Sequence, residues 1–183
     1  MCSSDLGVIF GDGAGAVVLG PTEDPGRGIF SVHLHADGSN AEKLWLEAAA
    51  SRRRPRLLPE DLDGDDPKAF PRMRGKYVFK HAVTRMPEVI GEALAHEGLS
   101  LADLDVLVPH QANLRINQMA AASMGLDESK VVNNIDRFGN TTAASIPIAL
   151  HEALADGRVA PGKLVCLAAF GAGFTWAAAL MRW

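Results

Sequence analysis

Two polar side chains, His110 and Asn140, each follow an apolar or aromatic segment and precede a helix-forming one. Such positions lie on loops between rigid elements, where catalytic groups are commonly mounted. A neutral imidazole and a carboxamide can both donate a hydrogen bond to an oxygen that gains negative charge. Taken singly, each residue also has a structural interpretation: His110 as a satisfied core histidine, and Asn140 as a turn residue that tolerates a left-handed backbone. The residue types are therefore compatible with oxyanion stabilisation, but they do not distinguish it from a structural role.

A third segment, Ala169-Phe170-Gly171-Ala172-Gly173, is rich in small side chains. Small residues let backbone N–H groups approach a ligand closely. This segment is therefore a candidate for backbone contacts with the same ligand.

The glycine-rich stretch near the N-terminus carries a different signal. Val8–Phe10, the bend at Gly11–Gly15 and the run Ala16–Leu19 predict a strand, a glycine bend and a second strand. Gly11, Gly13 and Ala16 approximate a dinucleotide-binding fingerprint, but no helix-forming sequence follows them. We therefore predict a structural role for these glycines.

The rest of the chain alternates strand and helix signals without an internal repeat or a linker. The pattern predicts an α/β fold in one unit. We expect a half-buried strand over Gly28–His35, an amphipathic helix over Lys76–His96 with a kink or break at Pro87, a buried strand over Asp105–Pro109, helices over Ala112–Met124 and Thr141–Asp156, an element beginning at Val131, and core strands over Leu164–Ala169 and Phe174–Met181.

Composition excludes several classes of protein. The 183 residues, 48% of them hydrophobic and 22% charged, are typical of one ordinary globular domain. A net charge of −4 gives no reason to expect nucleic acid binding. Cys2 and Cys166 lack metal-ligand spacing, and no apolar run of membrane-spanning length or signal peptide is present. The default expectation is a cytoplasmic protein without a membrane or nucleic acid partner.

Two further groups could bind something. His33 and His35 would share one face of a strand, but no third ligand lies nearby, so we expect hydrogen-bonded histidines and no metal site. The basic run Arg52–Arg56 precedes the acidic run Glu60–Asp66. It is a solvated loop of offsetting charges or a contact for an acidic partner or for phosphates, and the sequence leaves its role open.

The segments "VPHQANLRI", "DRFGNTTAAS" and "AFGAGFTW" resemble, in order and spacing, the second half of the ketoacyl-ACP synthase III family. The resemblance extends from about Leu6 to Trp183. It implies a thiolase-like layered α/β fold whose C-terminal half has a mixed five-stranded sheet. It also implies that residues 1–40 end the N-terminal half, that 41–75 are a variable loop region and that 76–183 form the C-terminal half. Residues 1–5 are expected not to be native to the family.

The activity that this resemblance implies is a decarboxylative Claisen condensation. An acyl-CoA primer and malonyl-ACP give 3-oxoacyl-ACP, the first step of type II fatty acid synthesis, without a cofactor and in a homodimer. The family's nucleophilic cysteine lies upstream of "FGDGAGA", and neither Cys2 nor Cys166 is expected to replace it. This chain alone is therefore expected to be inactive.

The resemblance also assigns residues. It implies that His110 and Asn140 are catalytic, that the backbone N–H near Ala172 donates to an oxyanion, and that Phe79 and Phe170 flank the coenzyme A tunnel and cleft. It implies acyl carrier protein (ACP) docking by Gln111, Ala112, Asn113, Leu114 and Arg115, together with Lys80. A core role for Phe79 and solvated roles for Lys80 and Arg115 remain open.

Two alternatives stand beside this interpretation. One is a fragment of a chalcone-synthase-like polyketide enzyme, which also uses cysteine, histidine and asparagine, although its ending is usually "GFGPG". The other is a non-catalytic half that binds ACP or a partner subunit.

Overall fold

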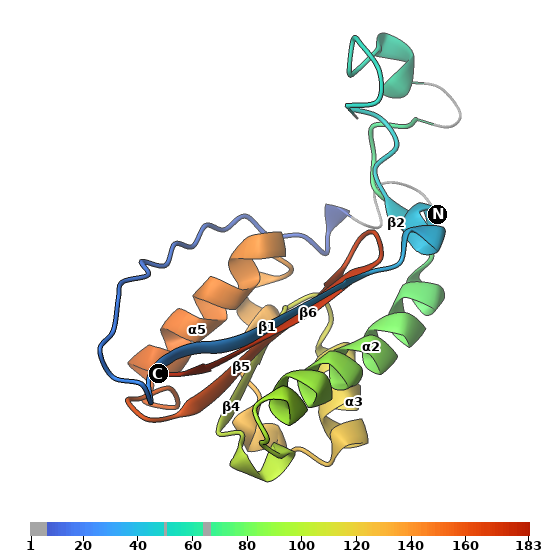
Figure 1. Cartoon of the computed structure of the whole chain (residues 1–183). Coiled ribbons are helices and arrows are strands. Elements are labelled where there is room, and N and C mark those ends of the chain that lie inside the picture. The colour runs from blue at the N-terminus through green and yellow to red at the C-terminus, as the bar shows by residue number, and fades with distance from the viewer. Residues whose placement is uncertain (1–6, 50, 64–66) are drawn as a thin grey trace.

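A four-stranded mixed sheet in the order β1-β6-β5-β4 forms the centre of the computed structural model, which describes residues 7–49, 51–63 and 67–183 (Figure 1). β4 (Val106–Pro109) and β5 (Leu164–Gly171) are parallel. β6 (Thr175–Arg182) is antiparallel to both β5 and β1 (Gly28–Ala36). These four strands confirm the strands predicted over Gly28–His35, Asp105–Pro109, Leu164–Ala169 and Phe174–Met181.

Helices cover both faces of this sheet, as the layered α/β prediction requires. α2 (Gly75–His96) and α3 (Leu114–Met124) pack on one face, and α5 (Ser145–Ala155) lies on the other (Figure 1). Because strand side chains alternate between faces, Leu107 joins the α2 layer while Val106 and Val108 join the α5 layer. Burying one such side chain contributes about 1.5–3 kcal/mol, so the two apolar layers hold the sheet rigid at its centre.

The helix ends follow from the sequence. α2 continues through Pro87 as one helix, and Gly98, with φ of 67°, follows its end. α3 ends at Gly125, which takes the left-handed conformation that glycine favours. None of the described helices combines the length and apolar character needed to cross a membrane. The shorter elements are β2 (Leu44–Trp45), β3 (Arg72–Met73), α4 (Ile135–Phe138) and 3₁₀ turns at Gly38–Lys43, Pro59–Asp61, Leu101–Asp103, Glu128–Lys130 and Thr142–Ala144.

The expected fifth strand of the main sheet is reduced to one bridge, between Leu107 and Val131. The Val132 N–H donates to the Leu107 carbonyl at 2.9 Å. Beyond that point the side chain of Gln111 takes the place of a strand backbone: it donates to the Val132 carbonyl at 2.9 Å and accepts from the Asn134 N–H at 3.0 Å. The prediction of five strands was therefore wrong for the described residues, because a side chain ends the ladder.

The two strands predicted around the glycine bend are also absent from the described residues. Phe10 makes a single bridge with Asn140, and the following segment runs irregularly along α5 before it reaches β1 (Figure 1). Val18 is 97% exposed. A strand needs a neighbouring edge to satisfy its N–H and C=O groups. In the described part of the chain, only the loop around Asn140 supplies backbone partners to this segment.

The described part of the region over residues 41–72 is mostly irregular, as predicted, and projects from the body of the molecule (Figure 1). Its base is the pair β2–β3. Within it, Asp61 is 1% exposed and accepts hydrogen bonds from Arg53 and from the Leu58 N–H. At least one arginine of the basic run therefore has a structural partner inside the same loop.

The paired histidines of β1 tie this strand to α2. His33 Nδ1 and His35 Nε2 contact the two carboxylate oxygens of Glu92, at 3.1 and 2.6 Å. This agrees with the prediction of hydrogen-bonded histidines. Among the residues that the structure describes, no group of three or more His, Cys, Asp or Glu side chains is arranged to hold a metal ion.

Candidate active site

His110 is the first residue after β4, and its backbone continues the pairing with β5. Its N–H donates to the Ala168 carbonyl at 2.8 Å, which fixes the residue at the rim of the sheet. Its Nδ1 lies 2.6 Å from the Ser145 Oγ at the start of α5. Burial lowers the pKa of His110 below its ordinary value of 6.5. The imidazole is therefore neutral at physiological pH.

This lowered pKa predicts a pH-dependent stability. Well above pH 6.5 the imidazole is neutral in the folded and in the unfolded chain. As the pH falls, the unfolded chain takes up the proton first, because its His110 has the higher pKa. Stability should fall below pH 6.5 until the pH passes the lowered folded-state pKa, by at most about 1.4 kcal/mol per pH unit. Urea unfolding of the unsubstituted chain and of His110→Gln between pH 7.5 and 5 measures this loss. The free energy of unfolding should fall more steeply with decreasing pH in the unsubstituted chain, because the two proteins share every other titratable group. Parallel pH curves would contradict it.

Asn140 lies in the loop after α4 and is 9% exposed. Its Oδ1 accepts a hydrogen bond from the Thr142 N–H at 2.9 Å, which leaves the amide NH₂ as the group available to a ligand. Thr142 has φ of 51°, a conformation in which a β-branched residue is an outlier. Backbone strain of this kind collects at functional sites, and here it accompanies the contact that orients Asn140.

The glycine bend that resembled a nucleotide motif supports this loop. The Gly11 N–H donates to the Asn140 carbonyl, and the Asn140 N–H donates to the Ile9 carbonyl, both at 3.0 Å. A Cβ on Gly11 would lie 2.1 Å from the Phe138 carbonyl oxygen. Gly139 has φ of 67° and ψ of −162°, a combination essentially limited to glycine. The two glycines therefore allow the close backbone contact that holds Asn140.

Replacing Gly11 by alanine is expected to displace the Asn140 loop, because a backbone carbonyl cannot move aside alone. We expect a loss of about 1–3 kcal/mol of stability, the usual range for an overpacked site. Urea unfolding measures it, with Gly38→Ala as the matched control, since a Cβ there meets no atom within 4 Å. Equal unfolding free energies for the two variants would show that the loop does not depend on this contact.

One cavity of about 1510 Å³ brings most of the predicted site residues together. Its size and its apolar lining suit a long, largely apolar ligand with a few polar groups. That the N-terminal segment and Ser145 line this cavity was not predicted from the sequence, although Ser145 is the last residue of the motif "DRFGNTTAAS". Among the cavity-lining residues are His110, Asn140, Ala172, Phe79, Phe170, Ala112, Asn113, Leu114, Arg115, Ser145, Ile9, Phe10 and Lys76.

Two predicted docking residues do not line this cavity. Lys80 is exposed on α2 outside it. Gln111 is 0% exposed, and its carboxamide is saturated by Pro109, Val132 and Asn134. The side chain of Gln111 cannot reach a carrier protein from this position, so the docking prediction for it was wrong. A buried carboxamide that bonds three backbone groups instead holds the loop that carries His110.

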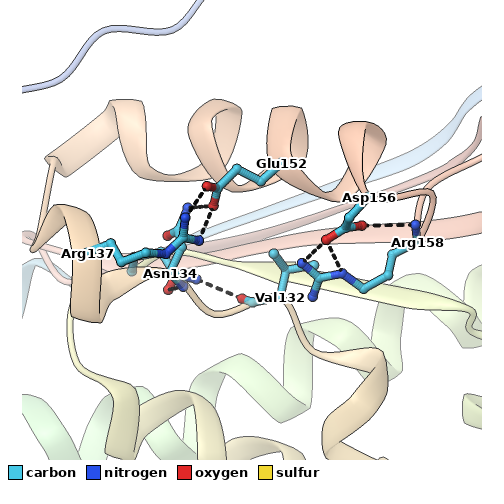
Figure 2. A network of polar contacts seen from close by, with 7 residues as sticks. Val132, Asn134, Arg137, Glu152, Asp156 and Arg158 are labelled. Carbon is cyan, nitrogen blue, oxygen red and sulfur yellow. Dashed lines mark hydrogen bonds and ion pairs between the residues drawn. The ribbon is translucent and has the colours of Figure 1, made fainter.

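An ion-paired cluster fixes the other loop. In Figure 2, Glu152 extends from α5 toward Arg137 and Asn134. Arg137 donates to both carboxylate oxygens, at 2.6 and 2.7 Å, and the Asn134 Nδ2 donates at 2.8 Å. The hydrogen bond from Arg137 lowers the pKa of Glu152. This cluster joins α4 to α5 immediately before Asn140, so the loop is anchored on both sides.

The turn between β5 and β6 forms another part of the cavity wall. Phe170 is buried against Phe174, with ring centroids 4.9 Å apart. Ala172 is exposed at the turn, and its carbonyl accepts from the Thr175 Oγ1 at 3.0 Å. The turn thus presents small residues to the cavity while the aromatic pair fixes its base.

Cys166 lies inside β5 and does not line the cavity. Burial raises the pKa of its thiol to about 12. It is a core residue, as predicted. Cys2 falls outside the described residues.

A mixed sheet between helical layers, with a histidine after one strand and an asparagine loop in the same cavity, agrees with the thiolase-like class that the resemblance implied and that the matching solved structures share. Two family models match the chain: 3-oxoacyl-[acyl-carrier-protein] synthase III C terminal over residues 94–183, and 3-oxoacyl-[acyl-carrier-protein] synthase III over residues 3–38. The chain belongs to the 3-oxoacyl-ACP synthase III family.

Named relatives agree with this assignment. The chain is 50% identical over 179 residues to beta-ketoacyl-[acyl-carrier-protein] synthase III of Rhodospirillum centenum, covering 96% of this chain and 52% of that protein. It is 50% identical over 175 residues to the synthase III of Escherichia coli K12, covering 96% and 51%. The structure of the Thermus thermophilus synthase III matches with a TM-score of 0.77 and 44% identity, over 87% of this chain and 47% of that one. The chain spans about half the length of these relatives, and they favour the synthase III prediction over a chalcone-synthase-like enzyme.

Proposed function

We propose that this chain supplies the decarboxylating half of a synthase that condenses an acyl-CoA primer with malonyl-ACP to give 3-oxoacyl-ACP. The observation that carries the proposal is the meeting of a neutral His110 and a donor-oriented Asn140 in one cavity. The relatives' names mention the acyl carrier protein, which fits a carrier-bound substrate.

The chemistry follows from these two donors. The malonyl carboxylate leaves as carbon dioxide, and its bonding electrons pass to the thioester, which becomes an enolate. His110 and Asn140 stabilise the enolate oxygen by hydrogen bonds. The enolate carbon then attacks the thioester carbonyl of an acylated cysteine, the new carbon–carbon bond forms, and the cysteine leaves as a thiolate. No cofactor enters this sequence, and coenzyme A and the phosphopantetheine of ACP take part as substrate groups.

Docking of the carrier is assigned to the start of α3. Asn113, Leu114 and Arg115 are exposed at the cavity wall, and the Asn113 Oδ1 accepts from the Arg115 N–H at 3.0 Å. Arg115 can pair with a phosphate at the mouth of the cavity. Lys80, exposed on α2, supplies a further cation to an acidic carrier. Phe79 and Phe170 flank the path of the pantetheine arm.

The nucleophilic cysteine belongs to a preceding half of the enzyme. In this proposal residues 1–40 complete that half, residues 41–75 are a variable loop and residues 76–183 are the C-terminal half. The complete enzyme is a homodimer of the cytoplasm. The rival proposal, a non-catalytic partner-binding half, predicts ACP binding without turnover.

A hybrid enzyme tests the proposal: this chain joined to the part of the Rhodospirillum centenum relative that it does not cover. Incubated with acetyl-CoA and malonyl-ACP, the hybrid enzyme should form acetoacetyl-ACP, detected by intact-protein mass spectrometry. The 183-residue chain alone should form none. An inactive hybrid enzyme that is folded and acetylated would refute the proposal, and an acetyl group mapped to Cys2 or Cys166 would show that the nucleophile lies in this chain.

A further inference from the structure

The hydroxyl of Ser145 connects the two loops of the site. Ser145 is the first residue of α5 and is 1% exposed. Its Oγ lies 2.6 Å from His110 Nδ1 and accepts the Gln111 N–H at 3.2 Å. Among the described residues these are the hydroxyl's hydrogen-bonding partners. The contact joins the end of β4 to the helix that follows the Asn140 loop.

This arrangement favours one of the two positions for the imidazole proton. A serine hydroxyl has one proton and two acceptor positions. The Gln111 N–H occupies one acceptor position. If His110 carried its proton on Nδ1, the second acceptor position would be filled and the buried hydroxyl proton would have no acceptor, which is unfavourable. If Ser145 donates to Nδ1, the hydroxyl proton, both oxygen and ring acceptors and the Gln111 N–H all take part in the two observed contacts.

We propose that Ser145 is a positioning residue that holds His110 as the neutral tautomer protonated on Nε2, leaving Nδ1 as the acceptor and Nε2–H as the donor to the ligand. The catalytic part of this inference rests on the proposed function, in which His110 donates to the enolate oxygen. The tautomer itself does not depend on that function. The buried Gln111 fixes the backbone that supplies the second contact to Ser145.

Nitrogen NMR of the ¹⁵N-histidine-labelled 183-residue chain tests the tautomer, with His110→Gln to assign the signal. We expect a single neutral form at pH 7.5, with the proton on Nε2. In Ser145→Ala the pKa of His110 should rise, because the neutral imidazole loses the hydroxyl that donates to its Nδ1. In Ser145→Thr, which keeps a hydroxyl, the pKa should return to that of the unsubstituted chain. Ser31→Ala, which removes another buried serine hydroxyl that does not line the cavity, should leave the His110 signal unchanged.

A proton on Nδ1 in the unsubstituted chain would overturn the proposal, and so would a Ser145→Ala chain whose His110 signal matches the original. If Ser145→Ala does not fold, the tautomer of the unsubstituted chain decides. In the hybrid enzyme, Ser145→Ala should lower kcat about fivefold to tenfold with little change in KM, as expected for one lost hydrogen bond. An unsubstituted hybrid that is folded and acetylated but inactive would refute the proposed function, whereas the expected tautomer in the 183-residue chain would leave the role of Ser145 in fixing the imidazole proton intact.

Discussion

Replacing Asn140 by alanine in the hybrid enzyme is expected to lower kcat for condensation by about a hundredfold to a thousandfold. Removal of one preorganised donor to a developing oxyanion typically costs about 3 kcal/mol of transition-state stabilisation. The Asn140 amide NH₂ is such a donor, because its oxygen is held by the Thr142 N–H. His110→Ala should have an effect of similar size. The double variant His110→Ala/Asn140→Ala should lose less transition-state stabilisation than the sum of the two single losses, because both donors act on one oxygen.

The measurement separates this effect from misfolding. Transfer of acetyl from acetyl-CoA to the hybrid enzyme's cysteine should persist in Asn140→Ala, whereas decarboxylation of malonyl-ACP should fall with kcat. Asn117→Ala is the matched control: it removes another buried asparagine, whose Nδ2 donates to the Asn133 Oδ1 at 2.9 Å outside the cavity. Asn140→Ala with an undiminished decarboxylation rate would exclude the assigned role.

Much of the fold could be predicted because the spacing of apolar residues and the local composition determine which segments form helices and strands. The apolar positions of α2 recur at helical steps, and β5 and β6 are apolar runs on either side of a glycine turn. That His110 and Asn140 lie in one cavity could be expected from their places after apolar or aromatic segments and from the family resemblance, whereas their catalytic role stays a prediction. Both types of signal are local in sequence.

The predictions that were wrong or incomplete share a cause, because the structure at each of these positions depends on residues that are distant in sequence. Val8–Phe10 has strand composition, yet a strand forms only where a second edge is available. The fifth strand ends because Gln111, twenty-one residues away, bonds the Val132 carbonyl in its place. A glutamine beside a motif histidine suggests a surface contact, and its burial shows only in three dimensions. Ser145 was missed for the same reason, because it meets His110 across thirty-five residues.

These long-range contacts explain how two loops form one site. The His110 loop is held by Ala168 and by Gln111, and the Asn140 loop by Gly11 and by the Glu152 cluster. Ser145 joins the two. Preorganised donors stabilise a transition state without reorganising at the moment of reaction. In the proposed reaction the polar network fixes the positions of the two donors, as the apolar layers fix the sheet.

Gln111→Leu should therefore destabilise the chain strongly, although leucine has a similar size and is apolar. It leaves the Pro109 and Val132 carbonyls and the Asn134 N–H without the partner that Gln111 provides. Each buried unsatisfied group costs about 1–3 kcal/mol, and with partial relaxation we expect a total loss of about 3–5 kcal/mol. Urea unfolding of the 183-residue chain measures the loss as a lower transition midpoint.

Gln118→Leu is the matched control, because that glutamine lies exposed on α3 and its Nε2 donates to the Glu128 Oε1 at 3.0 Å. Its unfolding free energy should change by less than about 0.5 kcal/mol. A Gln111→Leu chain as stable as this control would mean that the buried carboxamide does not hold the His110 loop. A large loss confined to Gln111 would instead show that this residue acts from inside the protein, as its burial requires.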